Sequence, residues 1–143
     1  MALITIDSEH LGIPETQYSS VVSMPSAEFT RICRELYTLN ETVNIDTKKG
    51  YIKFSVKSET VGGSIKIEEN NTEDLNSKVA VNVTEDVCLD FALRYLNMFT
   101  KASTLSQQVI LSLHLEIPLM VEYELEGLGT LKFYLAPRIA DEN

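Results

Sequence analysis

Hydrophobic and polar residues alternate along this chain in short runs of period two, and two stretches show the wider apolar spacing of a helix instead. A period of two predicts antiparallel strands with one buried face, and apolar residues at i, i+3, i+4 and i+7 predict an amphipathic helix. Each predicted helix follows one short strand and precedes three more, so one β-α-β-β-β plan occurs twice. The first copy is predicted at Ser19–Met24, Ser26–Tyr37 (helix), Thr42–Asp46, Tyr51–Lys57 and Val61–Glu68, and the second at Val87–Phe91, Ala92–Thr100 (helix), Gln107–Leu115, Leu119–Leu125 and Thr130–Leu135.

The segment between the two copies contains a polar run and a further alternating run. Glu69–Lys78 is polar and partly acidic, which predicts a mobile loop. Val79, Val81 and Val83 alternate with polar or small residues, as in another strand. The whole pattern predicts an α+β fold in which two antiparallel sheets are backed by two helices.

The two predicted helices place cations away from their apolar stripes. In the first, Ser26 is predicted as the N-cap, and Arg31 and Arg34 project together, three residues apart. In the second, Arg94, Asn97 and Lys101 share one side. Helices from equivalent places in a duplicated fold would lie side by side, so these cations would form one patch. The alternative is two solvated helix faces with incidental cations. The first stripe consists of Phe29, Ile32, Cys33 and Leu36.

Composition limits the possible partners and the setting of the chain. Its 143 residues, 44% of them hydrophobic, suit one domain with a real core. The formal net charge of −9 repels nucleic acid unless the few cations gather on one face. Cys33 and Cys88 are predicted as small core residues in a reducing compartment. The N-terminus lacks a signal-peptide pattern and no apolar run is long enough to span a membrane, so a soluble intracellular protein is predicted.

The sequence contains no recognisable catalytic or metal-binding arrangement. His10 and His114 have no neighbouring ligand pattern, so the spacing of a zinc site is absent. No nucleophile elbow, P-loop or dinucleotide-binding motif occurs. Glu122 and Glu124 share one strand face but lack a base or metal ligand nearby. We therefore predict a protein that is not an enzyme and that uses no cofactor or metal.

Two apolar segments lie outside the predicted helices and interrupt otherwise polar connections. Leu11-Gly12-Ile13-Pro14 precedes the first strand, and Leu135-Ala136-Pro137-Arg138-Ile139 leaves the last one. Exposed apolar segments often mark surfaces that bind partners. The alternative is that each packs down onto the domain as a tail.

Seven short motifs run through the chain in one register: Leu11-Gly12-Ile13-Pro14, Met24-Pro25-Ser26, Arg31-Ile32-Cys33-Arg34, Phe91-Ala92-Leu93-Arg94-Tyr95-Leu96, Phe99-Thr100-Lys101-Ala102, Val121-Glu122-Tyr123 and Tyr134-Leu135-Ala136-Pro137. Together they resemble the C-terminal half of the proliferating cell nuclear antigen family, the DNA sliding clamps of eukaryotes. The resemblance implies a homotrimeric ring in the nucleus, with helices lining the DNA hole and sheets outside. Such a ring tethers DNA polymerases and repair factors to DNA and catalyses no reaction. A checkpoint-type clamp subunit, or a peptide-binding module that does not encircle DNA, is the alternative.

The resemblance also assigns roles to individual residues. Loose, non-specific contact with duplex DNA is implied for Arg31, Arg34, Arg94 and Lys101. Lys49 matches a lysine that carries ubiquitin or a relative, although Gly50 departs from the family pattern there, and Arg138 stands where a lysine is usual. A pocket for partner peptides with a Gln-plus-aromatic motif is implied for Leu11, Gly12, Ile13, Pro14, Tyr18, Pro118, Tyr134, Leu135, Ala136, Pro137, Arg138 and Ile139.

The resemblance divides the chain into three parts. Residues 1–17 resemble the interdomain connector, residues 18–136 the C-terminal domain, and residues 137–143 the C-terminal tail. The first domain of the family is missing, so a fragment is expected. The strands at Val61–Glu68 and Thr130–Leu135 would then both be free edges. The isolated chain is expected to be a monomer in dilute solution.

Overall fold

A computed structural model of the chain describes residues 2–6, 18–57, 60, 62–74, 76–115, 117–125 and 127–138. Each predicted strand and helix of the two copies is present within a few residues of its predicted bounds. The elements are β1 (Ala2–Ile6), β2 (Ser20–Pro25), α1 (Ser26–Tyr37), β3 (Thr42–Lys48), β4 (Tyr51–Lys57), β5 (Gly62–Glu68), β6 (Ala80–Val83), β7 (Val87–Ala92), α2 (Leu93–Phe99), the 3-10 helix η1 (Thr100–Leu105), β8 (Gln108–His114), β9 (Ile117–Leu125) and β10 (Gly129–Leu135).

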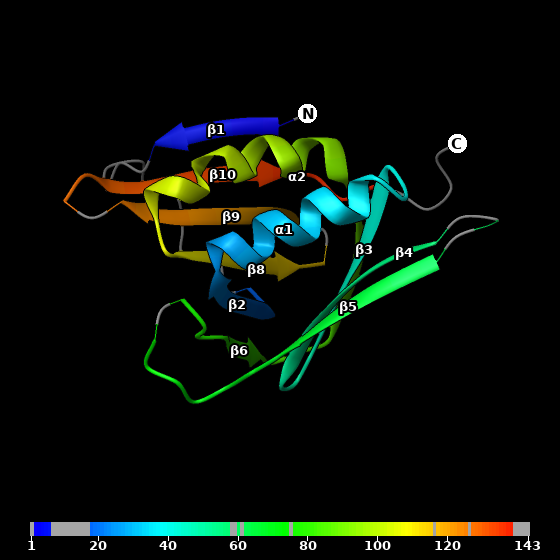
Figure 1. Ribbon diagram of the computed structural model, residues 1–143, viewed down its shortest axis with the longest axis horizontal. Helices are drawn as coiled ribbons and strands as arrows, with labels where there is room; N and C mark the ends of the chain where they lie inside the picture. The colour runs from blue at the N-terminus through cyan, green and yellow to red at the C-terminus, as the bar shows by residue number, and fades with distance from the viewer. Residues whose placement is uncertain are drawn as a thin grey trace.

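The strands form two antiparallel sheets. The six-stranded sheet has the order β1-β10-β9-β8-β2-β6, and the four-stranded sheet has the order β5-β4-β3-β7. The strands of the smaller sheet run across those of the larger one (Figure 1). The predicted α+β architecture is confirmed, and the alternating run at Val79–Val83 supplies β6, the outer strand of the larger sheet.

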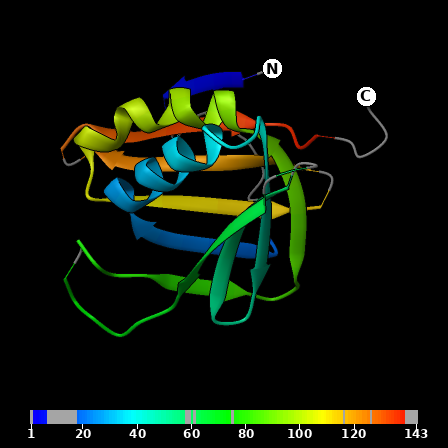
Figure 2. The ribbon, with the colours of Figure 1, turned by 45° about the vertical axis from the view of Figure 1, so that its right-hand side comes forward.

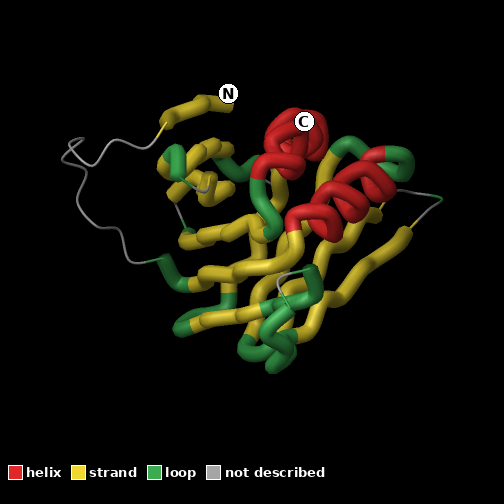
Figure 3. The backbone as a smooth tube through the Cα atoms, turned by 60° about the vertical axis from the view of Figure 1, so that its left-hand side comes forward, coloured by secondary structure: helices red, strands yellow, loops and turns green. Residues whose placement is uncertain are grey.

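The helices α1 and α2 lie side by side and cover one side of the sheets (Figures 1 and 3). Helix α1 packs against β2 and β8 of the larger sheet and also against β4 of the smaller one. Its predicted apolar stripe is confirmed, because Phe29, Ile32, Cys33 and Leu36 are all buried. The Phe29 and Phe54 rings lie 6.3 Å apart between centroids, which joins α1 to the smaller sheet. One hydrophobic core therefore extends beneath both helices.

The second helix is shorter than predicted, because α2 ends at Phe99 and the chain continues as η1. A 3-10 helix turns through three residues rather than 3.6, so η1 changes the direction in which successive side chains point. Asn97 is half-buried, and its Nδ2 donates hydrogen bonds to the carbonyl oxygens of Cys33 and Leu93, both at 3.0 Å. Asn97, which is predicted to share one side of the helix with Arg94 and Lys101, thus also joins α2 to α1.

Two other expectations about single residues need correction. Pro25 takes the N-cap position of α1, and Ser26 is the first helical residue, whose Oγ donates to the carbonyl oxygens of Ser103 and Ser106. Cys33 is buried as predicted, but Cys88 is exposed on β7. His114 is half-buried, and its Nδ1 lies 2.6 Å from the Ser19 Oγ. Contacts with distant segments engage Ser26 and His114, whereas Cys88 is exposed because it alternates with the buried Val87 along β7.

The edges of the sheets also differ from the expectation. Strand β1 pairs with β10 over its whole length, from Ala2 opposite Leu135 to Ile6 opposite Leu131 (Figure 2). The prediction of a free edge at Thr130–Leu135 is therefore wrong, because backbone groups of β10 bond to β1. Strand β5 lies at the outer edge of its sheet, as expected. Residues 7–17 lie outside the described residues, so the connector assignment stays a prediction.

Candidate functional site

The helical layer carries four exposed cations. Arg31 and Arg34 lie on α1, Arg94 lies on α2, and Lys101 lies on η1. Because α1 packs against both α2 and η1, all four belong to one continuous helical surface. The predicted side-by-side helices are confirmed, and the assignment of these four residues to DNA contact stays a prediction.

The charge on α1 is partly neutralised within the helix. Arg31 Nε donates to Glu28 Oε1 at 2.8 Å, and its Nη1 donates to Glu35 Oε1 at 3.1 Å. The hydrogen bond with Glu28 is the main cause of a raised Arg31 pKa, so this guanidinium stays charged. Exposed ion pairs of this kind contribute little stability and are screened by salt. Arg31 can therefore exchange its carboxylate partners for another anion at small cost.

The other three cations of the helical layer are free of ion pairs within the described part of the chain. The Arg94 guanidinium lies over the ring of Tyr95, 4.8 Å from its centroid, and Nη2 donates to the Tyr95 Oη at 2.8 Å. Such stacking fixes a planar group without removing its charge. Cations held on packed helices suit contact with phosphates, which positions a duplex without identifying its sequence.

The described part of the predicted peptide pocket lies around β9 and β10. Tyr18 is half-buried, and its pKa is raised first by burial and then by its neighbours Tyr134 and Glu122. Tyr18, which precedes β2, therefore lies within electrostatic range of Tyr134 on β10. Pro118 is exposed on β9, the strand next to β10.

The end of the last strand is fixed against the smaller sheet. Leu135 is buried, whereas Ala136 and Arg138 are exposed and Pro137 is half-buried. The Arg138 N–H donates to the carbonyl oxygen of Asp90 at 2.7 Å. Leu11, Gly12, Ile13, Pro14 and Ile139 lie outside the described residues, so the pocket is described only in part.

Lys49 is exposed in the tight turn between β3 and β4. The next residue, Gly50, has φ of +93°, a left-handed conformation that favours glycine. Its carbonyl oxygen accepts a hydrogen bond from the Glu69 N–H at 2.9 Å, which fixes the turn against the end of β5. A lysine on a fixed, exposed turn is open to modification, and nothing in the structure assigns that role to it.

The described residues form neither a metal-binding cluster nor a membrane-spanning helix. No group of three or more histidine, cysteine, aspartate or glutamate side chains is arranged there to hold a metal ion. None of the helices described is both long and apolar enough to cross a membrane.

The sequence analysis did not anticipate the contact between Ser19 and His114 or the polar row Asp90–Asn44–Ser55–Ser64, because sheet register joins residues that are distant in sequence.

Residues 12–138 match the family model for the C-terminal domain of proliferating cell nuclear antigen. The match includes both copies of the β-α-β-β-β plan and all four exposed cations of the helical layer. It also includes most of the predicted peptide pocket, with Leu11 and Ile139 just outside its two ends.

Proposed function

Because the chain belongs to the proliferating cell nuclear antigen family, we propose that it works as the C-terminal domain of a DNA sliding clamp that docks replication and repair partners on DNA. The observation that carries this proposal is the pair of packed helices, with their four exposed cations, on one side of two antiparallel sheets. The family is a group of non-enzymatic scaffolds, and we infer the same for this chain.

In this proposal the helical layer faces duplex DNA. Three of the four cations, Arg34, Arg94 and Lys101, form no ion pair in the described chain. The fourth, Arg31, would have to break its ion pairs with Glu28 and Glu35 before it could contact a phosphate. Contacts to phosphates alone give weak, salt-dependent binding without sequence preference. This is the behaviour that a ring needs if it is to slide.

We further propose that the chain forms part of a homotrimeric ring in a eukaryotic nucleus. A single helical layer of this size holds few phosphates, and the net charge of −9 opposes binding. A closed ring would keep the protein on the duplex by enclosing it, so tight contacts with the phosphates would not be needed. The same ring would carry Lys49 on an exposed turn, available for ubiquitin or a related modifier.

The partner pocket is proposed to receive peptides with a Gln-plus-aromatic motif. Tyr18 and Tyr134, which lie within electrostatic range of each other, would form its described wall, and Leu11 and Ile13 would supply aliphatic contacts. Compact apolar pockets of this kind provide most of the affinity at peptide interfaces.

Isothermal titration calorimetry with such a peptide tests the proposed pocket. We expect weak binding that is abolished when Leu11→Ala and Ile13→Ala are combined, with the melting temperature nearly unchanged. Leu128→Ala is the matched control, because Leu128 is 82% exposed and lies outside the pocket. Binding that survives the double substitution would show that the pocket has been assigned to the wrong residues.

A peptide-binding module that does not encircle DNA is the second candidate. The pairing of Arg31 with Glu28 and Glu35 favours it, since these carboxylates reduce the positive charge of α1. The two candidates share the peptide pocket and differ in whether the helices contact DNA, which the last measurement of the Discussion decides.

A further inference from the structure

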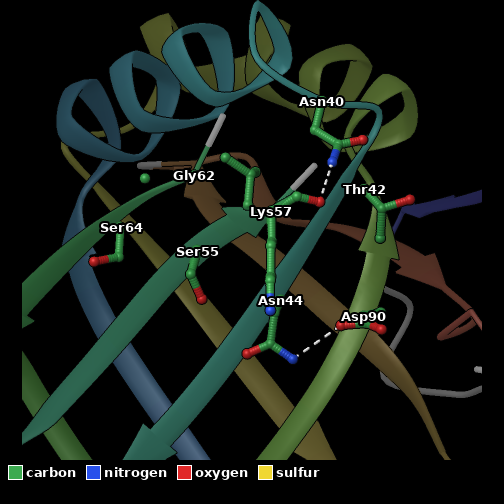
Figure 4. A pocket seen from close by; sticks show the side chains of 10 residues that line it. Asn40, Thr42, Asn44, Ser55, Lys57, Gly62, Ser64 and Asp90 are labelled. Carbon is green, nitrogen blue, oxygen red and sulfur yellow. Dashed lines mark hydrogen bonds between the residues drawn. The ribbon is translucent and has the colours of Figure 1, made fainter. Parts of the chain in front are cut away.

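The face of the four-stranded sheet that points away from the helices contains a polar hollow. Along β4, Ile52, Phe54 and Val56 are buried and face the core, so the alternate residues of this strand point outward. The hollow has a volume of about 730 Å³ and is lined from all four strands and from Asn40 (Figure 4). Asp90, which lines the hollow, accepts the backbone hydrogen bond of Arg138, so the hollow borders the proposed peptide pocket.

A row of polar side chains crosses the floor of this hollow. Asp90 lies opposite Asn44, Asn44 opposite Ser55, and Ser55 opposite Ser64. Figure 4 shows the row extending across the sheet from Ser64 to Asp90. Asn44 Nδ2 donates to Asp90 Oδ1 at 2.9 Å, which orients the amide, whereas neither serine has a described side-chain hydrogen bond of its own. The row therefore presents hydroxyl groups for a ligand's backbone.

Lysines flank the row on both sides along β4. Lys57 lies two residues beyond Ser55 and lines the hollow, while Lys53 lies two residues before it. Lys53 is directly opposite Lys66 of β5. Like charges on directly opposed residues of an antiparallel pair destabilise a sheet, with Cβ atoms only about 5 Å apart. The chain thus keeps two lysine residues directly opposed at some cost to the sheet.

Acidic residues lie near these lysines, but only one long ion pair joins the two groups in the described part of the chain. The Lys66 ammonium lies 3.9 Å from Glu68 at the surface and 4.3 Å from the centroid of the Tyr51 ring. Asp46 is the residue opposite Lys53 on β3. In the described part of the chain, however, no ion pair includes Lys53 or Lys57. Five of the 12 lysines and arginines fall between residues 48 and 66, which concentrates cations here on an acidic chain.

We propose that this outward face binds an acidic, extended peptide segment of a partner protein. One carboxylate would bind between Lys53 and Lys66, and a second would bind Lys57, with the intervening backbone over Ser55 and Ser64. Lys53 and Lys57 are four residues apart on one strand, about 13 Å. Residues i and i+4 of an extended peptide have the same separation and point to the same side.

Charge complementarity favours such a peptide over nucleic acid on this face. Asp46, Glu68 and Asp90 lie among the lysines, so a strand with a phosphate at every step would meet carboxylates repeatedly. A peptide can place its few charges at the lysines and neutral residues elsewhere. The overall charge of −9 also opposes a long polyanion.

The test is a titration of the full chain, labelled with ¹⁵N, with an acetylated and amidated peptide in which Glu-Ser-Gly-Ser-Glu is flanked by neutral residues. We expect amide shifts confined to β3, β4 and β5, with none for the matched peptide in which both glutamates are glutamine. Combining Lys53→Gln and Lys57→Gln should weaken binding by about tenfold, because each exposed pair contributes modestly. Lys78→Gln, a single charge loss outside this face, should change it little.

Several outcomes would overturn the proposal. Shifts that fall elsewhere, equal binding of the glutamine peptide, or no binding at low salt would each refute an acidic-peptide site. Displacement of the peptide from β3–β5 by a short single-stranded oligonucleotide at lower concentration would assign the face to nucleic acid. Heteronuclear spectra of the lysine variants must keep their dispersion, so that loss of binding is not loss of fold. None of these results bears on the Gln-plus-aromatic pocket.

Discussion

Tyr123 is fully buried on β9, and its hydroxyl is the buried side-chain polar atom that lacks a hydrogen-bond partner in the described part of the chain. Its ring meets that of Phe133 edge to face, with centroids 6.1 Å apart. Burial, and then the neighbouring Cys33, raise the Tyr123 pKa well above its ordinary value. The ring therefore stabilises the core, whereas the hydroxyl loses its hydration without compensation.

We expect Tyr123→Phe to stabilise the fold by about 1 kcal/mol, because the variant keeps the ring and removes the unsatisfied hydroxyl. Urea denaturation followed by circular dichroism measures the change. Tyr37→Phe, on the exposed end of α1, serves as the control and should leave stability unchanged. A loss of stability in Tyr123→Phe would mean that the hydroxyl has a partner after all.

At the scale of elements, the contact between the two helices decides how the cations are presented. Asn97 provides the side-chain hydrogen bond from α2 to the Cys33 carbonyl oxygen of α1, and Ser26 ties the first turn of α1 to η1. Both are polar contacts at the boundary of a core that is otherwise apolar. They fix the relative positions of Arg31 and Arg34 against Arg94 and Lys101.

Asn97→Ala should destabilise the fold by about 1–2 kcal/mol, because it removes the hydrogen bond that the Cys33 carbonyl oxygen accepts from Asn97. Thermal unfolding measures the loss, and Asn82→Ala on the exposed side of β6 is the control, with little expected change. If Asn97→Ala unfolds at the temperature of the parent chain, the side-chain contact does not hold the helices together.

The sequence was sufficient for elements that depend on local periodicity. The alternation of Ile52, Phe54 and Val56 with Lys53, Ser55 and Lys57 identified β4, and the stripe from Phe29 to Leu36 identified α1. The sequence was insufficient where a contact with a distant segment determines how a strand pairs or where a side chain lies. The pairing of β1 with β10, the placement of Asn97 between helices and the hydrogen bonds of Ser26 all depend on neighbours that no local pattern indicates.

The candidate sites also divide into those that a local sequence pattern indicates and those that depend on long-range contacts. The four helix cations could be named from the sequence because amphipathic spacing separates them from the core. The outward row from Asp90 to Ser64 could not, because it arises from the register of four strands. The Gln-plus-aromatic pocket was assigned by resemblance, and only Tyr18 and Tyr134 of its side chains are shown within electrostatic range of each other.

At the scale of the whole molecule, the edges of the sheets govern association. Strand β5 is an outer strand, but its exposed residues include Lys66 and Glu68, charges that discourage pairing between copies. In the larger sheet β1 covers the edge of β10 and is itself an outer strand. We therefore expect the isolated chain to be a monomer in dilute solution, with edge pairing only at high concentration. Multi-angle light scattering over a concentration series measures this, and a discrete oligomer at micromolar protein would contradict it.

The central claim is that the helical layer is the surface that contacts duplex DNA, and amide shift mapping during a DNA titration tests it most directly. At low salt we expect small, non-saturating shifts concentrated on α1, α2 and η1, which disappear as salt is raised and do not depend on base sequence. Combining Arg34→Gln with Arg94→Gln should reduce these shifts, whereas Lys53→Gln, a charge loss on the outward sheet face, should not. Shifts concentrated on the sheets, none on the helices at the lowest salt, or tight binding that salt does not weaken would contradict the account.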